Sequence, residues 1–186
     1  MIWIGTSGFQ YPEWKGHFYP AKLPNAKMLA YYAGQFPTTE INYTFRQIPA
    51  DTTINNWIAA TPESFWFTLK ILQQVTHIKR LRGCEALVGE FAAAARKFGP
   101  KLGIILVQLP PNFKKDLAVL GDFLGALPKD LRFTLEFRNE SWFADDVYAL
   151  LRQHKTALCI ADSDKIHTPE IATAEFGYFR LRDEGY

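Results

Sequence analysis

Residues 132–142 read RFTLEFRNESW, the pattern of a buried strand that ends in charge. Because side chains alternate between the two faces of a strand, Phe133, Leu135 and Phe137 share one face, and Glu136 and Arg138 share the other. A carboxylate and a guanidinium group are costly to bury unless they pair or bind a ligand. The carboxyl end of this strand is therefore where we expect a functional site.

Strand-like and helix-like stretches alternate along the rest of the chain. Besides the quoted stretch, the expected strands are 2–6, 38–42, 65–72, 102–109, 156–162 and 177–182. The expected helices are 25–36, 51–60, 84–98, 115–127 and 145–154, and only a short, weakly helical link separates the last two strands. Apolar strands that alternate with helices favour a parallel sheet covered by helices. Right-handed crossovers leave an open doubly wound sheet or a closed barrel.

Polar residues at the ends of the expected strands decide between these two folds. They come from six strands and are Glu40, Asn42, Lys70, Gln108, Glu136, Arg138, Asp162, Arg180 and Arg182. An open sheet concentrates its site at one switch point, whereas a barrel mouth gathers groups from many strands. The pattern predicts an α/β fold of the TIM-type (β/α) barrel class, formed by residues 1–186 as a single domain.

Composition is typical of a soluble globular protein. The chain has 186 residues, 48% hydrophobic and 22% charged, with a net charge of +2 that gives no strong footprint for nucleic acid. Cys84 and Cys159 show no metal-ligand spacing, and they suit a reducing compartment better than a disulfide scaffold. No signal peptide or membrane-spanning run is visible. We expect a cytoplasmic protein that does not enter a membrane.

Several motifs, in this order along the chain, resemble the YecE-like family, also called domain of unknown function 72. They are Gly5-Thr6-Ser7-Gly8, Glu40-Ile41-Asn42-Tyr43-Thr44-Phe45, Lys70, Thr76-His77, Gln108-Leu109-Pro110-Pro111-Asn112-Phe113 and Glu136-Phe137-Arg138-Asn139-Glu140-Ser141-Trp142. Tyr11, Trp14, Gly16 and Tyr19-Pro20 fit the same family. The resemblance covers nearly the whole chain. It implies a TIM-type barrel, distantly similar to sugar isomerases and endonucleases, and brings no established activity.

The chain departs from the family at its carboxyl end. The family often has Arg-Leu-His-Gly after the seventh strand, where this chain has Arg180-Leu181-Arg182-Asp183. The family also continues for another helix and an eighth strand, whereas seven strands are visible here. We therefore expect a C-terminally incomplete barrel whose first and last strands, 2–6 and 177–182, keep apolar, unpaired edges.

Glu136 and Arg138 allow two interpretations. The first is a structural ion pair that closes the top of the barrel. In the second, Arg138 binds a phosphate or carboxylate in its planar fork, and Glu136 is a base or a metal ligand. Glu40, Glu136 and Asp162 offer hard oxygen ligands for Mg²⁺ or Mn²⁺. Because Lys70, Arg138 and Arg180 balance these carboxylates, we expect no metal.

The remaining site residues follow from the same argument. The expected catalytic residues are Glu136, Lys70 and Asp162, through general acid–base chemistry. The expected substrate-binding residues are Arg138, Arg180, Glu40, Asn42, Gln108, Ser7, Tyr11, Trp14 and His77. Ser7 lies in a glycine turn whose backbone N–H groups face a ligand, and Tyr11 and Trp14 form an aromatic wall or a lid packed on itself. His77 is a surface or capping residue in the alternative interpretation.

Three functions remain open from the sequence. The first is an enzyme that acts on a small anionic substrate, phosphorylated or a sugar acid, in the barrel mouth. The second is a protein that binds nucleic acid or acts on phosphodiesters, which the small net charge and the scarcity of histidines disfavour. The third is a ligand-binding protein without catalysis, which the absence of an eighth β/α unit favours. A small anionic molecule is the expected partner if the protein is such an enzyme.

Overall fold

The computed structural model describes residues 1–163 and 166–182 and shows a mixed α/β fold. The chain divides into two compact units. Unit 1 contains residues 1–70 and 93–103, and unit 2 contains residues 71–92 and the chain from 104 onward. Among the described residues, no helix has the length and apolar character needed to cross a membrane.

Unit 1 is built on three parallel strands, β1 (Gly5–Ser7), β2 (Thr38–Ile41) and β3 (Trp66–Lys70). β2 pairs with β1 on one side and with β3 on the other, so that Glu40 is paired with both Ser7 and Thr68. The helices of this unit are α1 (Met28–Ala33) and α2 (Asp51–Ala59). Short 3₁₀ turns lie at Pro12–Trp14, Asn25–Lys27, Tyr43–Phe45 and Gly99–Lys101.

Unit 2 contains further parallel strands and the longer helices. Its strands are β4 (Leu102–Gln108), β5 (Phe133–Glu136), β6 (Ala157–Ser163), β7 (Ile166–His167) and β8 (Tyr178–Leu181). Its helices are α3 (Glu85–Arg96), α4 (Leu117–Ala126) and α5 (Asp145–Gln153), and α3 and β4 extend into unit 1 at one end. A π-helical turn covers Gln74–Ile78, and a 3₁₀ turn covers Glu140–Trp142. β4, β5, β6 and β8 pair in parallel in this order.

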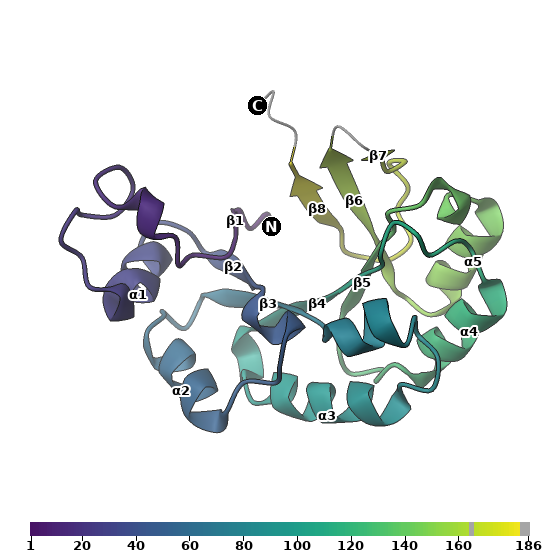
Figure 1. The fold of residues 1–186 in the computed structure, drawn as a ribbon, viewed down its shortest axis with the longest axis horizontal. Coiled ribbons are helices and arrows are strands. Elements are labelled where there is room, and N and C mark those ends of the chain that lie inside the picture. Colours follow the sequence, from purple (N-terminus) through teal and green to yellow (C-terminus); the bar gives the residue numbers. More distant parts are fainter. Residues whose placement is uncertain (164–165, 183–186) are drawn as a thin grey trace. The chain divides into compact units, whose positions relative to one another are not determined.

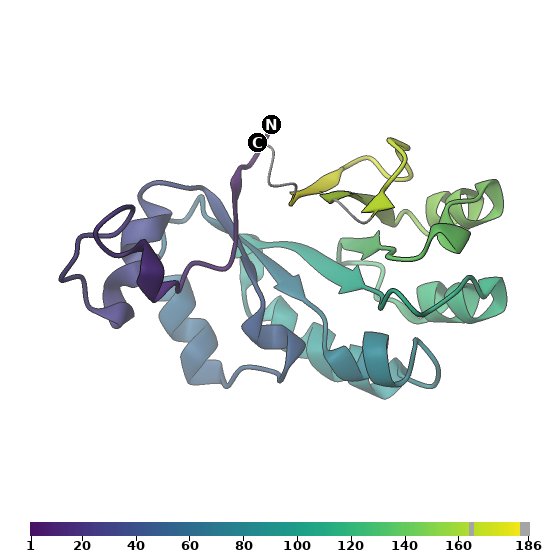
Figure 2. The same ribbon diagram turned by 45° about the horizontal axis from the view of Figure 1, so that its top comes forward.

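The two faces of β5 differ as the sequence predicts. Phe133 and Leu135 are buried, and Phe137 stacks on Trp142 with ring centroids 4.8 Å apart. The Trp142 indole donates to the Phe113 carbonyl at 2.6 Å, which ties the loop after β5 to the loop after β4. Figures 1 and 2 show α4 and α5 on one side of β5 and β6, with β8 beside β6. Glu136 projects from the other face of β5. There it accepts hydrogen bonds from Gln108 of β4 and Arg180 of β8.

The predicted first strand, 2–6, is shifted in the structure. β1 spans Gly5–Ser7 and pairs with β2 from Thr38 onward. Ile2 and Ile4, which we expected to mark an apolar strand, are 86% and 67% exposed. Gly5 explains the start of pairing, since a Cβ atom at this position would lie 1.9 Å from the Thr38 carbonyl oxygen.

Two connections also differ from expectation. The link after β6 is not helical within its described residues. Instead, β7 pairs antiparallel with β6 through Asp162 and Ser163, and residues 168–177 are irregular. This adds a short strand to the seven that the sequence predicts, but it is a turn back along β6 rather than a further β/α unit. The loop after β3 contains the π-helical turn, in which Val75 and Thr76 are buried. Asp183, part of the departure from the family motif, and the terminal Tyr186 lie outside the described residues.

Candidate functional site

A buried carboxylate holds two guanidinium groups in unit 2. Glu136, at the end of β5, accepts hydrogen bonds on both oxygens from the Gln108 amide, at 2.8 and 2.9 Å. Arg180 of β8 donates through Nη1 to Oε2 at 2.5 Å. Arg138 donates through Nε to Oε1 at 3.1 Å. We call Gln108, Glu136, Arg138 and Arg180 the arginine cluster.

The electrostatics of the arginine cluster favour an ionised Glu136. Burial is the largest influence and by itself raises the pKa of Glu136, but Arg180, Gln108, Arg138 and Arg182 outweigh it and hold that pKa below its usual value. The side chains of Glu136 and Arg180 are 2% and 4% exposed, whereas that of Arg138 is 35% exposed. Arg138 uses Nε toward Glu136. The guanidinium group of this partly exposed side chain is therefore oriented by a buried carboxylate.

Other expected site residues of unit 2 make separate contacts. Asp162, at the end of β6, lies 2.7 Å from Nδ1 of His167 on β7. The Asp162 carbonyl accepts from the backbone N–H of Arg182. His77 lies on the π-helical turn, with its Nδ1 2.8 Å from the Thr76 hydroxyl. His167 was not expected as a neighbour of Asp162, because the antiparallel pairing of β7 with β6 was not visible in the sequence.

A hydrogen-bonded chain joins the ends of β1 and β2 in unit 1. The Asn42 amide donates to the Ser7 hydroxyl at 2.9 Å, and that hydroxyl donates to Oε1 of Glu40 at 2.8 Å. The pairing of Ser7 with Glu40 in the sheet places both side chains on the same face. Because the Asn42 nitrogen is the donor, the amide is oriented with its oxygen as the remaining acceptor. The three residues act as one polar unit.

Tyrosine hydroxyls hold the loop that follows β1. Tyr11 donates to the Ser7 carbonyl and Tyr19 to the Phe9 carbonyl. Burial, with a smaller contribution from Tyr32, raises the pKa of Tyr19 to about 12, so its hydroxyl remains a donor at neutral pH. The Trp14 ring packs on Tyr11 with ring centroids 4.6 Å apart. Tyr11 and Trp14 therefore pack on each other, as the second interpretation of this loop expects, and an aromatic wall that faces a ligand stays a prediction.

Lys70, at the end of β3, lies on the same face of the sheet as Glu40, because Glu40 is paired with Thr68 two residues before it. The lysine is 9% exposed, and its Nζ lies 4.3 Å from the centroid of the Phe45 ring. Its position at the strand end agrees with the face that the sequence predicts.

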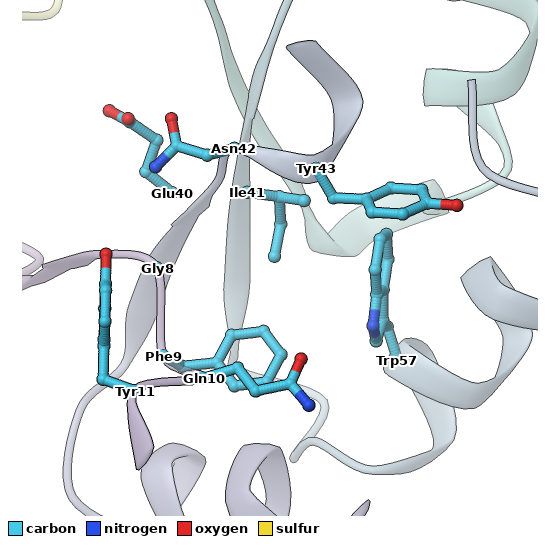
Figure 3. Close-up of a pocket in the computed structure, with 9 residues that line it drawn as sticks. All are labelled: Gly8, Phe9, Gln10, Tyr11, Glu40, Ile41, Asn42, Tyr43 and Trp57. Carbon is cyan, nitrogen blue, oxygen red and sulfur yellow. The ribbon is translucent and has the colours of Figure 1, made fainter. Parts of the chain in front are cut away.

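A pocket of about 230 Å³ lies in unit 1 between the loop after β1 and the end of β2. It is lined by Gly8, Phe9, Gln10, Tyr11, Glu40, Ile41, Asn42, Tyr43 and Trp57. Figure 3 shows Tyr43 and Trp57 together on one side of this group and Tyr11 on the opposite side. The Tyr43 and Trp57 rings are nearly perpendicular, at 84°, with centroids 5.9 Å apart.

The sequence argument missed five lining residues of this pocket: Phe9, Gln10, Ile41, Tyr43 and Trp57. Phe9 and Gln10 follow the Gly5–Gly8 turn, and Tyr43 follows Asn42. They are thus direct neighbours in the sequence of expected site residues, and this adjacency could have identified them. Trp57 lies on α2, and nothing in the sequence marked it as a site residue. Its position in a helix predicts only that its side chain packs on the sheet.

The structure brings the expected residues together in two groups, one in each unit. Ser7, Tyr11, Glu40 and Asn42 meet in unit 1, and the arginine cluster forms in unit 2. Convergence of both groups in a single cavity stays a prediction. Within residues 1–163 and 166–182, no three or more His, Cys, Asp and Glu side chains are grouped as metal ligands would be.

Comparison with known proteins shows the family of this chain. The model of the family described as protein of unknown function DUF72 matches residues 3–185. The chain belongs to the DUF72 family. It is 30% identical over 173 residues to the UPF0759 protein YecE of Escherichia coli K12, covering 90% of this chain and 61% of YecE. It is 31% identical over 158 residues to the UPF0759 protein YunF of Bacillus subtilis, covering 80% of this chain and 54% of YunF.

The DUF72 chain is also similar to solved structures. It matches the crystal structure of a DUF72 family protein from Thermotoga maritima with a TM-score of 0.87 and 29% identity, over 97% of this chain and 74% of the other. A DUF72 family protein from Enterococcus faecalis matches with a TM-score of 0.79 and 22% identity, which shows a shared fold. The DUF72 chain thus spans 61% and 54% of the lengths of the two UPF0759 proteins.

Proposed function

We propose that this DUF72 protein binds a small anionic molecule, a phosphate or carboxylate compound, through Arg138 and Arg180. The observation that carries the proposal is the arginine cluster, in which one ionised carboxylate holds two guanidinium groups. The cluster therefore has one more positive than negative charge. Arg138 is partly exposed, and its contact with Glu136 fixes its orientation. Less side-chain conformational entropy is therefore lost when an anion binds.

Glu136 serves in this proposal as the residue that positions both arginines. Its oxygens already accept four hydrogen bonds, and its pKa is held below the usual value. A general base needs a pKa near the working pH and an accessible lone pair. Asp162, in the same unit, remains a candidate for acid–base chemistry on the bound anion, and Glu136 acts through the arginines. Lys70 of unit 1 stays a catalytic prediction of the sequence.

We further propose the TIM-type (β/α) barrel as the fold within which this site works. Support comes from the parallel pairing of strands within each unit and from the similarity to the solved DUF72 structures. In such barrels the active site lies at the carboxyl ends of the strands. Glu40, Lys70, Glu136 and Asp162 all stand at or next to such ends.

The test is calorimetric titration with inorganic phosphate and with a sugar phosphate. Arg138→Ala is expected to weaken binding by roughly 10- to 150-fold, because a hydrogen bond to a charged group contributes about 1.5–3 kcal/mol. Arg138→Lys retains the charge but loses the planar fork, and we expect intermediate affinity. Arg152→Ala, at an exposed position on α5, is the matched control and should bind like the unchanged protein.

Circular dichroism and urea unfolding of the same variants separate binding from folding. If Arg138→Ala unfolds, or if neither anion binds the unchanged protein, Arg138 is a structural partner of Glu136 and the proposal is wrong. An added oligonucleotide arm tests the alternative of a nucleic-acid ligand. Binding of oligonucleotide but not of the small anions would favour that alternative.

A further inference from the structure

A second group of cations lies in unit 2, outside the arginine cluster. It comes from the turn at 79–83 and from the loop after β4, and we call it the basic surface: Lys79, Arg80, Arg82, Lys114 and Lys115. Two contacts hold the turn and the loop together. The Arg80 guanidinium carbon lies 5.8 Å from the centroid of the Phe113 ring, and Arg82 forms an ion pair with Asp116 at 2.7 Å.

Three of these five cations have no carboxylate partner among residues 1–163 and 166–182. Asp116 pairs with Arg82, and Asp146 of α5 pairs with Lys115 at 2.9 Å. No carboxylate of the described residues lies within ion-pair distance of the other three cations, Lys79, Arg80 and Lys114. Lys79 and Lys114 are exposed, and Arg80 is half-buried. Uncompensated charges of one sign on a surface attract a partner of the opposite sign.

The backbone of the turn has a conformation that its side chains disfavour. Arg80 and Leu81 have φ angles of 47° and 68°, in the left-handed region that residues with a Cβ atom rarely adopt. Leu81 is 2% exposed, and its backbone N–H donates to the Val75 carbonyl at 2.9 Å. A buried leucine thus fixes the turn that carries Lys79 and Arg80. Backbone strain of this kind is concentrated at sites that hold a ligand.

The other side chains of the basic surface indicate which anion fits. Phe113 is 5% exposed and lies under Arg80, so this ring is not open for a base to stack on. Ile78 next to the turn is 69% exposed, but attachment to a lipid surface needs the whole apolar face of a helix. The phosphate groups of a nucleic-acid backbone need only cations and hydrogen-bond donors.

We infer that the basic surface binds the phosphate backbone of a nucleic-acid duplex, without regard to base sequence. Lys79, Arg80 and Lys114 make the contacts, because a phosphate does not have to displace a carboxylate from them. Arg82 and Lys115 hold the turn and the loop in place through their own ion pairs. The surface is additional to the anion site proposed at Arg138 and Arg180, with which it shares no residue.

Fluorescence anisotropy with a labelled short DNA duplex of mixed sequence tests the inference in a salt titration. Three phosphate contacts give a slope of about −2.7 for the logarithm of the association constant against the logarithm of the salt concentration. Affinity should therefore fall roughly 40-fold between 50 and 200 mM salt. A duplex of another sequence should bind equally well.

Two other polyanions serve as competing partners in the same titration. They are polyglutamate and vesicles of phosphatidylserine and phosphatidylcholine, and both should bind more weakly than the duplex. No binding of the duplex at 50 mM salt, or binding that does not depend on salt, would overturn the inference. Tighter binding of the vesicles or of polyglutamate would also overturn it, in favour of a lipid surface or an acidic peptide.

Two variants locate the contacts. Arg80→Gly and Lys114→Ala each remove one cation, so each should reduce the slope by about 0.9, and the same salt step should then cost roughly 12-fold in affinity. Because glycine adopts positive φ without strain, Arg80→Gly should be at least as stable as the unchanged protein in urea unfolding. Weaker binding by a protein of equal or greater stability is a loss of contact and not of fold. If Arg80→Gly does not fold, Lys114→Ala decides the question alone.

Two control variants differ in charge or in place. Lys129→Ala removes an exposed lysine of the same unit from the loop before β5, whereas the basic surface follows the carboxyl ends of β3 and β4, and it should leave the slope unchanged. Glu85→Gln removes an exposed carboxylate at the start of α3, close in the chain to the turn, and should strengthen duplex binding. An unchanged slope in both Arg80→Gly and Lys114→Ala would show that the duplex binds elsewhere and would overturn the inference.

The same variants separate the basic surface from the arginine cluster. Arg138→Ala should lose phosphate binding and keep duplex binding, and Lys114→Ala should show the reverse. Duplex binding without binding of phosphate or sugar phosphate would contradict the proposed function and leave this inference standing. Binding of the small anions without the duplex would do the opposite.

Discussion

Glu136 illustrates how a single buried residue shapes a site without reacting. It lies at the end of β5, and groups from β4, β8 and the loop after β5 converge on its two oxygens. Two charges in the interior are costly to desolvate, and their attraction offsets that cost only when geometry and further hydrogen bonds are good. Gln108 supplies these hydrogen bonds here. The residue therefore couples the stability of unit 2 to the orientation of Arg138.

Replacement of Glu136 by Gln is expected to destabilise the protein by about 3–5 kcal/mol, because the buried guanidinium group of Arg180 would lose the carboxylate that it contacts at 2.5 Å. Urea unfolding followed by circular dichroism measures the loss. Asp51→Asn is the control, since Asp51 pairs with Lys97 at the surface and an exposed pair contributes less than about 1 kcal/mol. Equal losses in the two variants would mean that Arg180 finds another partner.

The loss of unfolding free energy at acidic pH should depend on the same residue. The pKa of Glu136 is lower in the folded protein than its usual value of about 4.3. Such a group contributes stability that is present above the unfolded-state pKa and is lost as the pH falls through the folded-state pKa. The difference in unfolding free energy between the unchanged protein and Glu136→Gln should therefore shrink as the pH falls below about 4. A difference that stays constant down to the acid transition contradicts this expectation.

The strands set where polar groups gather in each unit. Parallel pairing places Ser7 beside Glu40, and Gln108 beside Glu136, so that each pair of side chains projects from the same face. The loops after β1 and β2 then add Phe9, Tyr11 and Tyr43 to the pocket, and α2 adds Trp57. β1 depends on a close approach of two backbones at Gly5, which only a residue without Cβ permits.

Gly5→Ala is expected to destabilise the protein by about 1–3 kcal/mol, because the new methyl group would lie 1.9 Å from the Thr38 carbonyl oxygen and force β1 away from β2. Urea unfolding curves of the two proteins measure the loss.

A control of opposite sign is available on α3. Gly89 is exposed within the helix and has open space around its Cα, so Gly89→Ala should stabilise the protein by about 0.5–1 kcal/mol. If Gly5→Ala is also neutral or stabilising, the strand tolerates the shift and pairing does not depend on this glycine.

At the scale of the whole molecule, exposed apolar residues lie next to the first strand in the chain and within the last one. Ile2 and Ile4 precede β1, and Phe179 and Leu181 of β8 are 61% and 63% exposed. Exposed apolar strands invite pairing with another chain. That the first and last strands keep unpaired edges stays a prediction of the sequence, and exposure of these side chains alone predicts self-association.

Phe179→Lys is expected to reduce concentration-dependent self-association, because a charge on a strand opposes its pairing with another strand. Light scattering coupled to size-exclusion chromatography, across a range of protein concentrations, measures the effect. Ile78→Lys is the control, since Ile78 is 69% exposed but lies on the π-helical turn rather than on a strand. The same reduction in both variants would point to solubility in general rather than to strand pairing.

The sequence by itself determined the order of elements, the two faces of β5 and the residues at the strand ends. These follow from local periodicity, since Phe133, Leu135 and Phe137 alternate with Thr134, Glu136 and Arg138 in any extended strand. Tertiary structure alone decided where pairing begins, because the contact of Gly5 with Thr38 joins residues far apart in the chain. It also decided that Asp162 meets His167 through the antiparallel pairing of β6 with β7, and that Trp57 of α2 lines a pocket with Glu40. Periodicity gives the direction of a side chain relative to its own element, and only packing decides which distant side chain it meets.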